Sequence, residues 1–155
     1  MSVSIVKGKN FTRRFETGAN TLLSAGTPVK MGTNVVVALA TGDPEIRTDQ
    51  FVGITSNAST DTATVAGFVD VIVIIPGETV LRAPATTPAN LAAGILGDSV
   101  TFDVTTGVYT VDEDEGDDPD VHGLLIVGYD ATNGTVDFQV KPEAMNIGSP
   151  DATAE

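Results

Sequence analysis

The chain has 155 residues, of which 21 are acidic and 8 are basic, so its formal net charge is −13. Such a charge repels nucleic-acid phosphates and anionic lipid surfaces, and we therefore expect neither a nucleic acid nor a membrane as a partner. The chain contains no cysteine, which excludes disulfides, thiolate nucleophiles and thiolate zinc sites. With neither a recognisable signal peptide nor an apolar run of ~20 residues, the composition predicts a globular protein of one or two small domains.

The chain starts with a basic segment. Residues 1–19 contain four of the eight basic residues, namely Lys7, Lys9, Arg13 and Arg14. On an acidic protein this asymmetry favours docking onto an acidic partner. We predict an extended N-terminal arm over residues 1–19; an N-terminal strand with solvated charges is an equally weighted alternative. The arginine and aromatic side chains typical of interface anchors predict an intermolecular contact at Phe11, Arg13, Arg14 and Phe15.

The rest of the chain is dominated by strand-forming residues. Short runs rich in Val, Ile and Thr alternate with turns rich in Gly, Asn and Asp, which predicts an all-β protein, a small antiparallel sandwich or barrel. The predicted strands are Thr27–Met31, Asn34–Ala40, Phe51–Ser56, Thr64–Ile75, Glu78–Ala83, Ser99–Thr105, Val108–Asp112, His122–Asp130 and Thr135–Lys141. The best helix candidate is Thr87–Ile95, where Thr87 could cap the first turn.

Hydrophobic alternation predicts which strands have a solvent-facing side. Phe68–Ile75 is almost continuously apolar, and we expect it to be buried on both faces. Val100–Thr105 and Val136–Lys141 alternate and should pack on one face only. Thr106 and Gly107 predict a hairpin between two of the strands.

The segment that follows residue 83 interrupts the strand rhythm with Ala and Pro residues. We therefore predict a core over residues 20–84 and, over residues 85–147, either a second β lobe or a continuation of the same sandwich. The last residues, 148–155, are small, polar and acidic, which predicts a flexible tail.

Two features have the residue types of a chemical site. His122 is the single histidine, but no nucleophile-elbow pattern accompanies it, and we interpret it as a strand-edge residue. Residues 112–120 hold seven carboxylates, yet the glycine and glutamate positions of a helix–loop–helix calcium site are not matched. We expect this acidic tract to be a solvated, self-repelling hairpin tip, and a weak surface cation site stays an open alternative.

The remaining motifs leave a hydrolase and a glycan-binding module as alternatives. Paired carboxylates are available for glycoside hydrolysis, although the chain lacks Trp. A binding module of the fibre or adhesin type would expose aromatic residues at loop tips, for which Tyr109, Tyr129 and Phe68 are candidates, with the core as their favoured location. We predict no catalytic, cofactor-binding or metal-binding residue and expect the protein not to be an enzyme.

Several stretches together resemble a known family. They are Phe51–Thr55, Ala58–Thr60, Ala66–Val71 and Pro76–Leu81, and the resemblance covers residues 26–110. Their succession resembles the capsid decoration, or cement, proteins of tailed bacteriophages, small β-rich proteins that are added to the outside of an assembled head. The chain also resembles a broader set of small phage proteins with a Gly-x-Pro-Val pattern near the start, here Gly26–Val29.

The resemblance implies a β-barrel or tulip-like core, a homotrimer at capsid threefold positions and no enzymatic activity. It also implies the major capsid protein as partner and the capsid exterior of the virion as location, after synthesis in the host cytoplasm. The residues expected to contact the capsid or a neighbouring subunit are those of the basic segment, Phe11, Arg13, Arg14 and Phe15.

Overall fold

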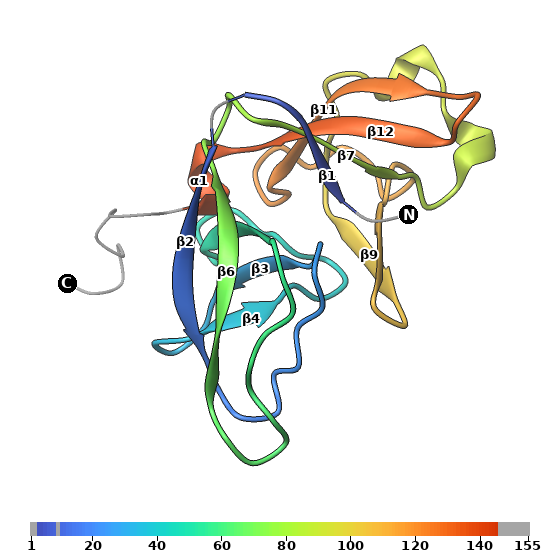
Figure 1. The fold of residues 1–155 in the computed structure, drawn as a ribbon. Coiled ribbons are helices and arrows are strands. Elements are labelled where there is room, and N and C mark those ends of the chain that lie inside the picture. Colours follow the sequence, from blue (N-terminus) through green and yellow to red (C-terminus); the bar gives the residue numbers. More distant parts are fainter. Residues whose placement is uncertain (1–2, 9, 146–155) are drawn as a thin grey trace.

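The structure is a computed structural model that describes residues 3–8 and 10–145 (Figure 1). It confirms the all-β prediction: three antiparallel sheets form a sandwich-like fold, and within the described residues none of them closes into a barrel. The strands are β1 (Ser4–Lys7), β2 (Asn10–Thr17), β3 (Pro28–Met31), β4 (Val36–Ala38), β5 (Phe51–Thr55), β6 (Gly67–Ile74), β7 (Val80–Pro84), β8 (Ser99–Val100), β9 (Phe102–Thr105), β10 (Val108–Val111), β11 (Leu124–Asp130) and β12 (Thr135–Val140).

The first sheet has the order β2-β6-β5-β3-β4 and contains the long β2–β6 pair seen at the left of Figure 1. The pair runs in unbroken register from Asn10 opposite Ile74 to Thr17 opposite Gly67. The sheet curls so that its two edge strands approach each other, and its inner side encloses a small aliphatic cluster. The cluster consists of Leu23, Val29, Val36, Val52, Val69, Val71 and Val73, with Phe15 and Met31 packed against it.

The second sheet has the order β1-β7-β12-β11-β8, and a separate hairpin pairs β9 with β10. The hairpin turns at Thr106 and Gly107, both at positive φ, which confirms the predicted hairpin. The helix candidate Thr87–Ile95 forms two 3-10 turns instead, η1 (Pro88–Asn90) and η2 (Ala93–Ile95), since the alanine- and proline-rich segment is too short for regular helix. A single α-helical turn, α1 (Pro142–Met145), follows β12.

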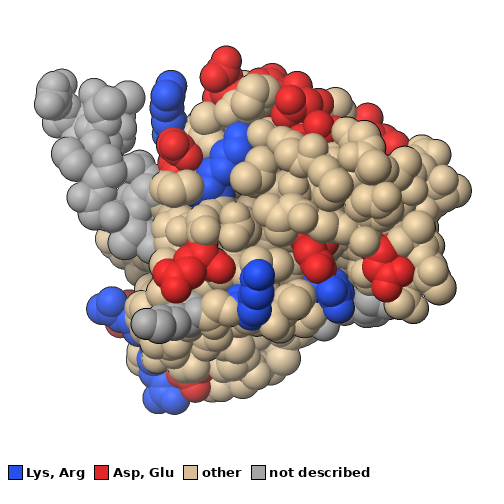
Figure 2. Space-filling view, turned by 90° about the horizontal axis from the view of Figure 1, so that it is seen from above, with Lys and Arg blue, Asp and Glu red and all other residues tan. Residues whose placement is uncertain are grey.

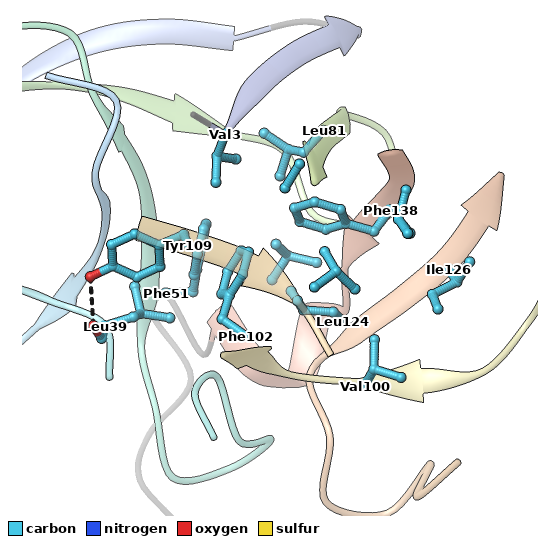
Figure 3. Close-up of a cluster of buried hydrophobic side chains, with 14 of the residues drawn as sticks. Val3, Leu39, Phe51, Leu81, Val100, Phe102, Tyr109, Leu124, Ile126 and Phe138 are labelled. Atoms are coloured by element: carbon cyan, nitrogen blue, oxygen red, sulfur yellow. Dashed lines mark hydrogen bonds between the residues drawn. The ribbon is translucent and has the colours of Figure 1, made fainter. Parts of the chain in front are cut away.

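The main core lies between the sheets and joins them (Figure 3). Phe102 makes edge-to-face contacts with Tyr109 and Phe138, at ring-centroid distances of 5.8 and 5.4 Å. The Tyr109 hydroxyl donates to the Leu39 carbonyl at 2.6 Å, so the hairpin is tied to the first sheet. Because one buried cluster takes side chains from both sheets, the fold has a continuous core.

The N-terminal segment differs from the expected arm. Residues 4–7 form an edge strand of the second sheet and residues 10–17 an edge strand of the first, which matches the alternative of an N-terminal strand. Strand β7 belongs to the second sheet, so the chain passes from the first sheet to the second at the turn after β6. The predicted tail lies outside the described residues.

Strand β6 corrects one expectation from the apolar pattern. Val69, Val71 and Val73 are buried, whereas Phe68 is 48% exposed and Asp70 and Ile72 are half-buried. The predicted burial on both faces is therefore wrong for this strand. The physical reason is that a run of apolar residues does not reveal whether a second layer covers the far face, and here that face stays partly open.

Candidate interaction surface on strand β2

The strand geometry of β2 divides the four predicted contact residues between two faces. Side chains along a strand alternate, so Phe11, Arg13 and Phe15 share one face and Arg14 takes the other. β2 forms hydrogen bonds with β6 and is an edge of its sheet, which leaves most of the strand exposed. The strand thus places three of the four side chains on one face and the fourth on the other.

The first face borders an apolar depression, which we call the Phe11 hollow. It has a volume of roughly 160 Å³ and is lined by Phe11, Arg13, Phe15, Met31, Gln50, Val52 and Val73. Phe11 is 54% exposed, whereas Phe15 is half-buried against the aliphatic cluster. The Arg13 guanidinium carbon lies 5.8 Å from the Phe15 ring centroid, within the range of a cation–π contact. The hollow therefore combines an apolar floor with one positive charge at its rim.

The second face carries an ion pair between directly opposed residues. Arg14 on β2 faces Asp70 on β6, and Arg14 Nε donates to Asp70 Oδ1 at 2.9 Å. The hydrogen bond from Arg14 lowers the pKa of Asp70, and the pair raises the pKa of Arg14. Arg14 thus forms an intramolecular ion pair and does not line the Phe11 hollow.

A second depression adjoins this ion pair, and we call it the Phe68 shelf. It is lined by Arg14, Asn57, Thr60, Phe68, Val69 and Asp70. Phe68 was a candidate exposed aromatic of a binding module with the core as its favoured location, and the structure places its ring on the surface instead. Asp70 within the apolar run was the available signal, because a carboxylate inside a strand marks a face that is partly open to solvent.

The remaining aromatic candidates and the histidine have structural positions. Tyr109 is buried in the main core and Tyr129 packs against it. His122 lies just before β11, its Nδ1 is 2.9 Å from the Ser99 carbonyl and its Nε2 is 3.7 Å from Glu115 Oε2. This position at the start of a strand agrees with its interpretation as a strand-edge residue.

The acidic tract is largely exposed, as expected, but it connects β10 with β11 and is not a hairpin tip, and several of its carboxylates are engaged in hydrogen bonds. Glu113 is buried, and its two oxygens accept the backbone N–H groups of Thr86 and Thr87 at 2.9 and 2.7 Å. Burial raises the pKa of Glu113, against the lowering effect of these hydrogen bonds. Glu115 accepts the backbone N–H of Thr101.

Further carboxylates of the tract continue this pattern. Asp117 accepts the backbone N–H of Ser99 at 2.7 Å, and Asp114 accepts the Asn90 side-chain amide at 3.0 and 3.1 Å. The sequence did not reveal these contacts, because carboxylates can replace water at the N–H groups of irregular segments, and this region has several such segments. Acidic side chains still gather along the upper margin of the face in Figure 2.

Within residues 3–8 and 10–145, no group of three or more His, Asp or Glu side chains is arranged to hold a metal ion. Among the same residues, none of the helices combines the length and the apolar character needed to cross a bilayer. Comparisons with protein-family models, with curated proteins and with solved structures found no match to this chain. A functional inference therefore has to come from the residues and their arrangement.

Proposed function

We propose that the protein is a non-enzymatic structural component of a tailed-phage virion, which binds the outside of the capsid through the Phe11 hollow. The observation that carries this proposal is the exposed edge of β2, where Phe11 and Arg13 border an apolar depression. Aromatic and arginine side chains around a depression are typical of the residues that dominate protein–protein affinity. The resemblance of residues 26–110 to decoration proteins supplies the class of partner, the major capsid protein.

The use of the carboxylates supports a structural role over a hydrolytic one. Asp61, Glu113, Glu115 and Asp117 each accept hydrogen bonds from backbone N–H groups of neighbouring segments. A general acid or base needs an oxygen directed at a substrate in a cleft. These carboxylates instead hold loops in place, so their abundance has an explanation within the fold.

The proposal includes a homotrimer, as the resemblance implies. A ring with threefold symmetry uses two different surface patches of each subunit, so each copy keeps identical capsid contacts around the axis. We expect sedimentation velocity to give about 47.7 kDa, three times the 15.9 kDa of one chain. If the protein were monomeric at all concentrations in solution and also when bound to the capsid, this part of the proposal would be contradicted.

The decisive experiment measures binding to heads of the encoding phage that were purified without this protein. Co-sedimentation of the wild type should be saturable. Phe11→Ala and Arg13→Ala should each weaken binding at least about tenfold, as for interface anchors. Point variants are required because deletion of residues 1–15 would remove most of β2 from its sheet.

The matched control is Phe68→Ala, which removes an equally exposed aromatic ring from the opposite face of the same strand pair. Binding of this variant should stay within about twofold of the wild type, because the two sites are formed by different side chains on opposite faces of the strands. Equal binding by Phe11→Ala and the wild type would overturn the proposed contact. Failure of the wild type to bind heads would overturn the function itself.

A further inference from the structure

We infer that the Phe68 shelf is a binding site for a neutral sugar residue, separate from the capsid contact. The shelf joins an exposed aromatic ring to a preorganised group of polar side chains. Its members are Arg14 on β2, Phe68 and Asp70 on β6, and Asn57 and Thr60 on the loop after β5. Nothing in the capsid-binding proposal uses these side chains.

The aromatic ring provides the apolar part of the site. Phe68 is 48% exposed although its strand is internal to the sheet. Its backbone is held by the neighbouring loop, because the Phe68 N–H donates to Thr60 Oγ1 at 2.8 Å and the Phe68 carbonyl accepts the Thr60 N–H at 2.9 Å. A solvent-facing ring on this held backbone offers a flat apolar surface on which the C–H face of a pyranose can stack.

The polar side chains are held in one arrangement by mutual hydrogen bonds. Asp70 accepts from Arg14 Nε at 2.9 Å and from Asn57 Nδ2 at 3.1 Å, and its own N–H donates to Asn57 Oδ1 at 3.1 Å. Such a network lowers the entropy lost on binding, because the side chains are already ordered.

The same network leaves hydrogen-bonding capacity for a ligand. The Arg14 side chain is 68% exposed, and a guanidinium has five N–H donors, of which two point at Asp70. Thr60 uses its oxygen to accept the Phe68 N–H, which leaves its hydroxyl hydrogen as a donor. Asp70 adds carboxylate lone pairs as acceptors. Sugar hydroxyls both donate and accept, so they match this mixture of groups.

The charge of the shelf selects a neutral ligand over an anion. The positive charge of Arg14 is compensated by Asp70, and the whole chain has a net charge of −13. A phosphate or sulfate site would instead need cationic donors without a carboxylate beside them. The depression is shallow, with a volume of roughly 90 Å³, which fits part of one sugar ring. Affinity for a monosaccharide should therefore be in the millimolar range.

The test is a titration of the full chain, followed by the backbone amide signals in NMR spectra. The probes are the methyl glycosides of glucose, galactose, mannose and N-acetylglucosamine, each to about 50 mM, where a millimolar site is mostly occupied. We expect saturable shifts at the amides of Asn57, Thr60, Phe68 and Asp70 with at least one probe. The absence of such shifts with all four glycosides would overturn the site.

Two variants separate this site from general surface effects. Phe68→Ala should weaken the responding glycoside at least about tenfold, whereas Phe11→Ala should leave it unchanged, because Phe11 is the comparably exposed ring on the opposite face. Asp70→Asn leaves the Arg14 charge uncompensated and should shift preference from the glycoside toward inorganic sulfate. Equal responses of both Phe variants, or stronger binding of sulfate than of glycosides by the wild type, would contradict the assignment. Because the two Phe variants report on different sites, failure here would leave the capsid proposal standing.

Discussion

The carboxylate of Asp61 accepts the backbone N–H of Leu22 at 2.9 Å, and Leu22 itself lies in the left-handed region at φ +51°. The same carboxylate oxygen accepts the Thr21 N–H at 2.7 Å, and the other oxygen accepts the Thr17 hydroxyl at 3.2 Å. A left-handed leucine is unfavourable by itself, so it persists only where neighbouring contacts fix it. The buried carboxylate thus holds the loop after β2 together with the hydrogen bonds of Asn20 and Leu23 to the segment around Asp61.

Replacement of Asp61 by Ala should destabilise the protein by about 1–2 kcal/mol, because a buried charged acceptor is lost and the N–H groups of Thr21 and Leu22 lose their partner. Urea unfolding measures this change. Glu16→Gln is the control, since Glu16 is exposed on the adjacent strand, and its effect should stay within about 0.5 kcal/mol. A similar stability for both variants would show that Asp61 does not hold the loop.

The pH dependence of stability should have opposite contributions from Asp61 and Glu113. Burial raises the pKa of Asp61, but hydrogen bonds from Ser59, Leu22, Thr21 and Thr17 outweigh this effect and lower the pKa below 3.8. A lowered folded-state pKa stabilises the protein above the unfolded-state pKa, and this contribution disappears as the pH falls through the folded value. The stability difference between the wild type and Asp61→Asn should therefore be largest above about pH 4 and shrink in acid.

For Glu113 the sign is reversed. Burial raises its pKa above 4.5, so the folded state binds the proton more readily than the unfolded state. Its contribution to stability increases as the pH falls through the raised pKa. Carboxyl carbon NMR titration measures both groups directly. A pKa above 3.8 for Asp61, or below 4.5 for Glu113, would contradict these assignments.

The acidic tract should respond unequally to loss of its carboxylates. Asp117→Ala removes the acceptor of the Ser99 N–H and should cost about 1–2 kcal/mol. Asp120→Ala removes the same charge from another exposed residue of the tract and should change stability by less than about 0.5 kcal/mol. Both variants remove one negative charge, so the difference between their thermal unfolding temperatures reports the contribution of the Ser99–Asp117 hydrogen bond. Equal effects would show that the hydrogen bond from the Ser99 N–H to Asp117 does not stabilise the fold.

Glycine is required at one position of β5. A Cβ atom on Gly53 would overlap the backbone oxygen of Ile72 on β6, which a side-chain movement cannot relieve. Gly53→Ala should therefore cost more than about 3 kcal/mol or prevent folding. The control is Gly94→Ala, where a Cβ atom would meet open space among the described residues, and thermal unfolding should be nearly unchanged. A wild-type melting temperature for Gly53→Ala would show that the two strands can separate at little cost.

The sequence by itself determined the fold class and much of the strand content. Val and Phe alternate with polar residues over β12, and Thr106-Gly107 has the residues of a tight turn, so local physics specified a strand and a hairpin there. The Arg and Phe residues of β2 could be predicted as contact residues, because their types and spacing are visible in the sequence. These features depend on neighbours in sequence.

Only the tertiary structure decided what those residues face. β2 pairs along β6, which puts Phe11 and Arg13 at an apolar hollow and Arg14 against Asp70. The carboxylate of Glu113 reaches Thr86 and Thr87, 27 and 26 positions away, and turns an apparent charge cluster into a support for a loop. Such contacts join residues distant in the chain, and their energy depends on burial and geometry that exist only after the strands have paired.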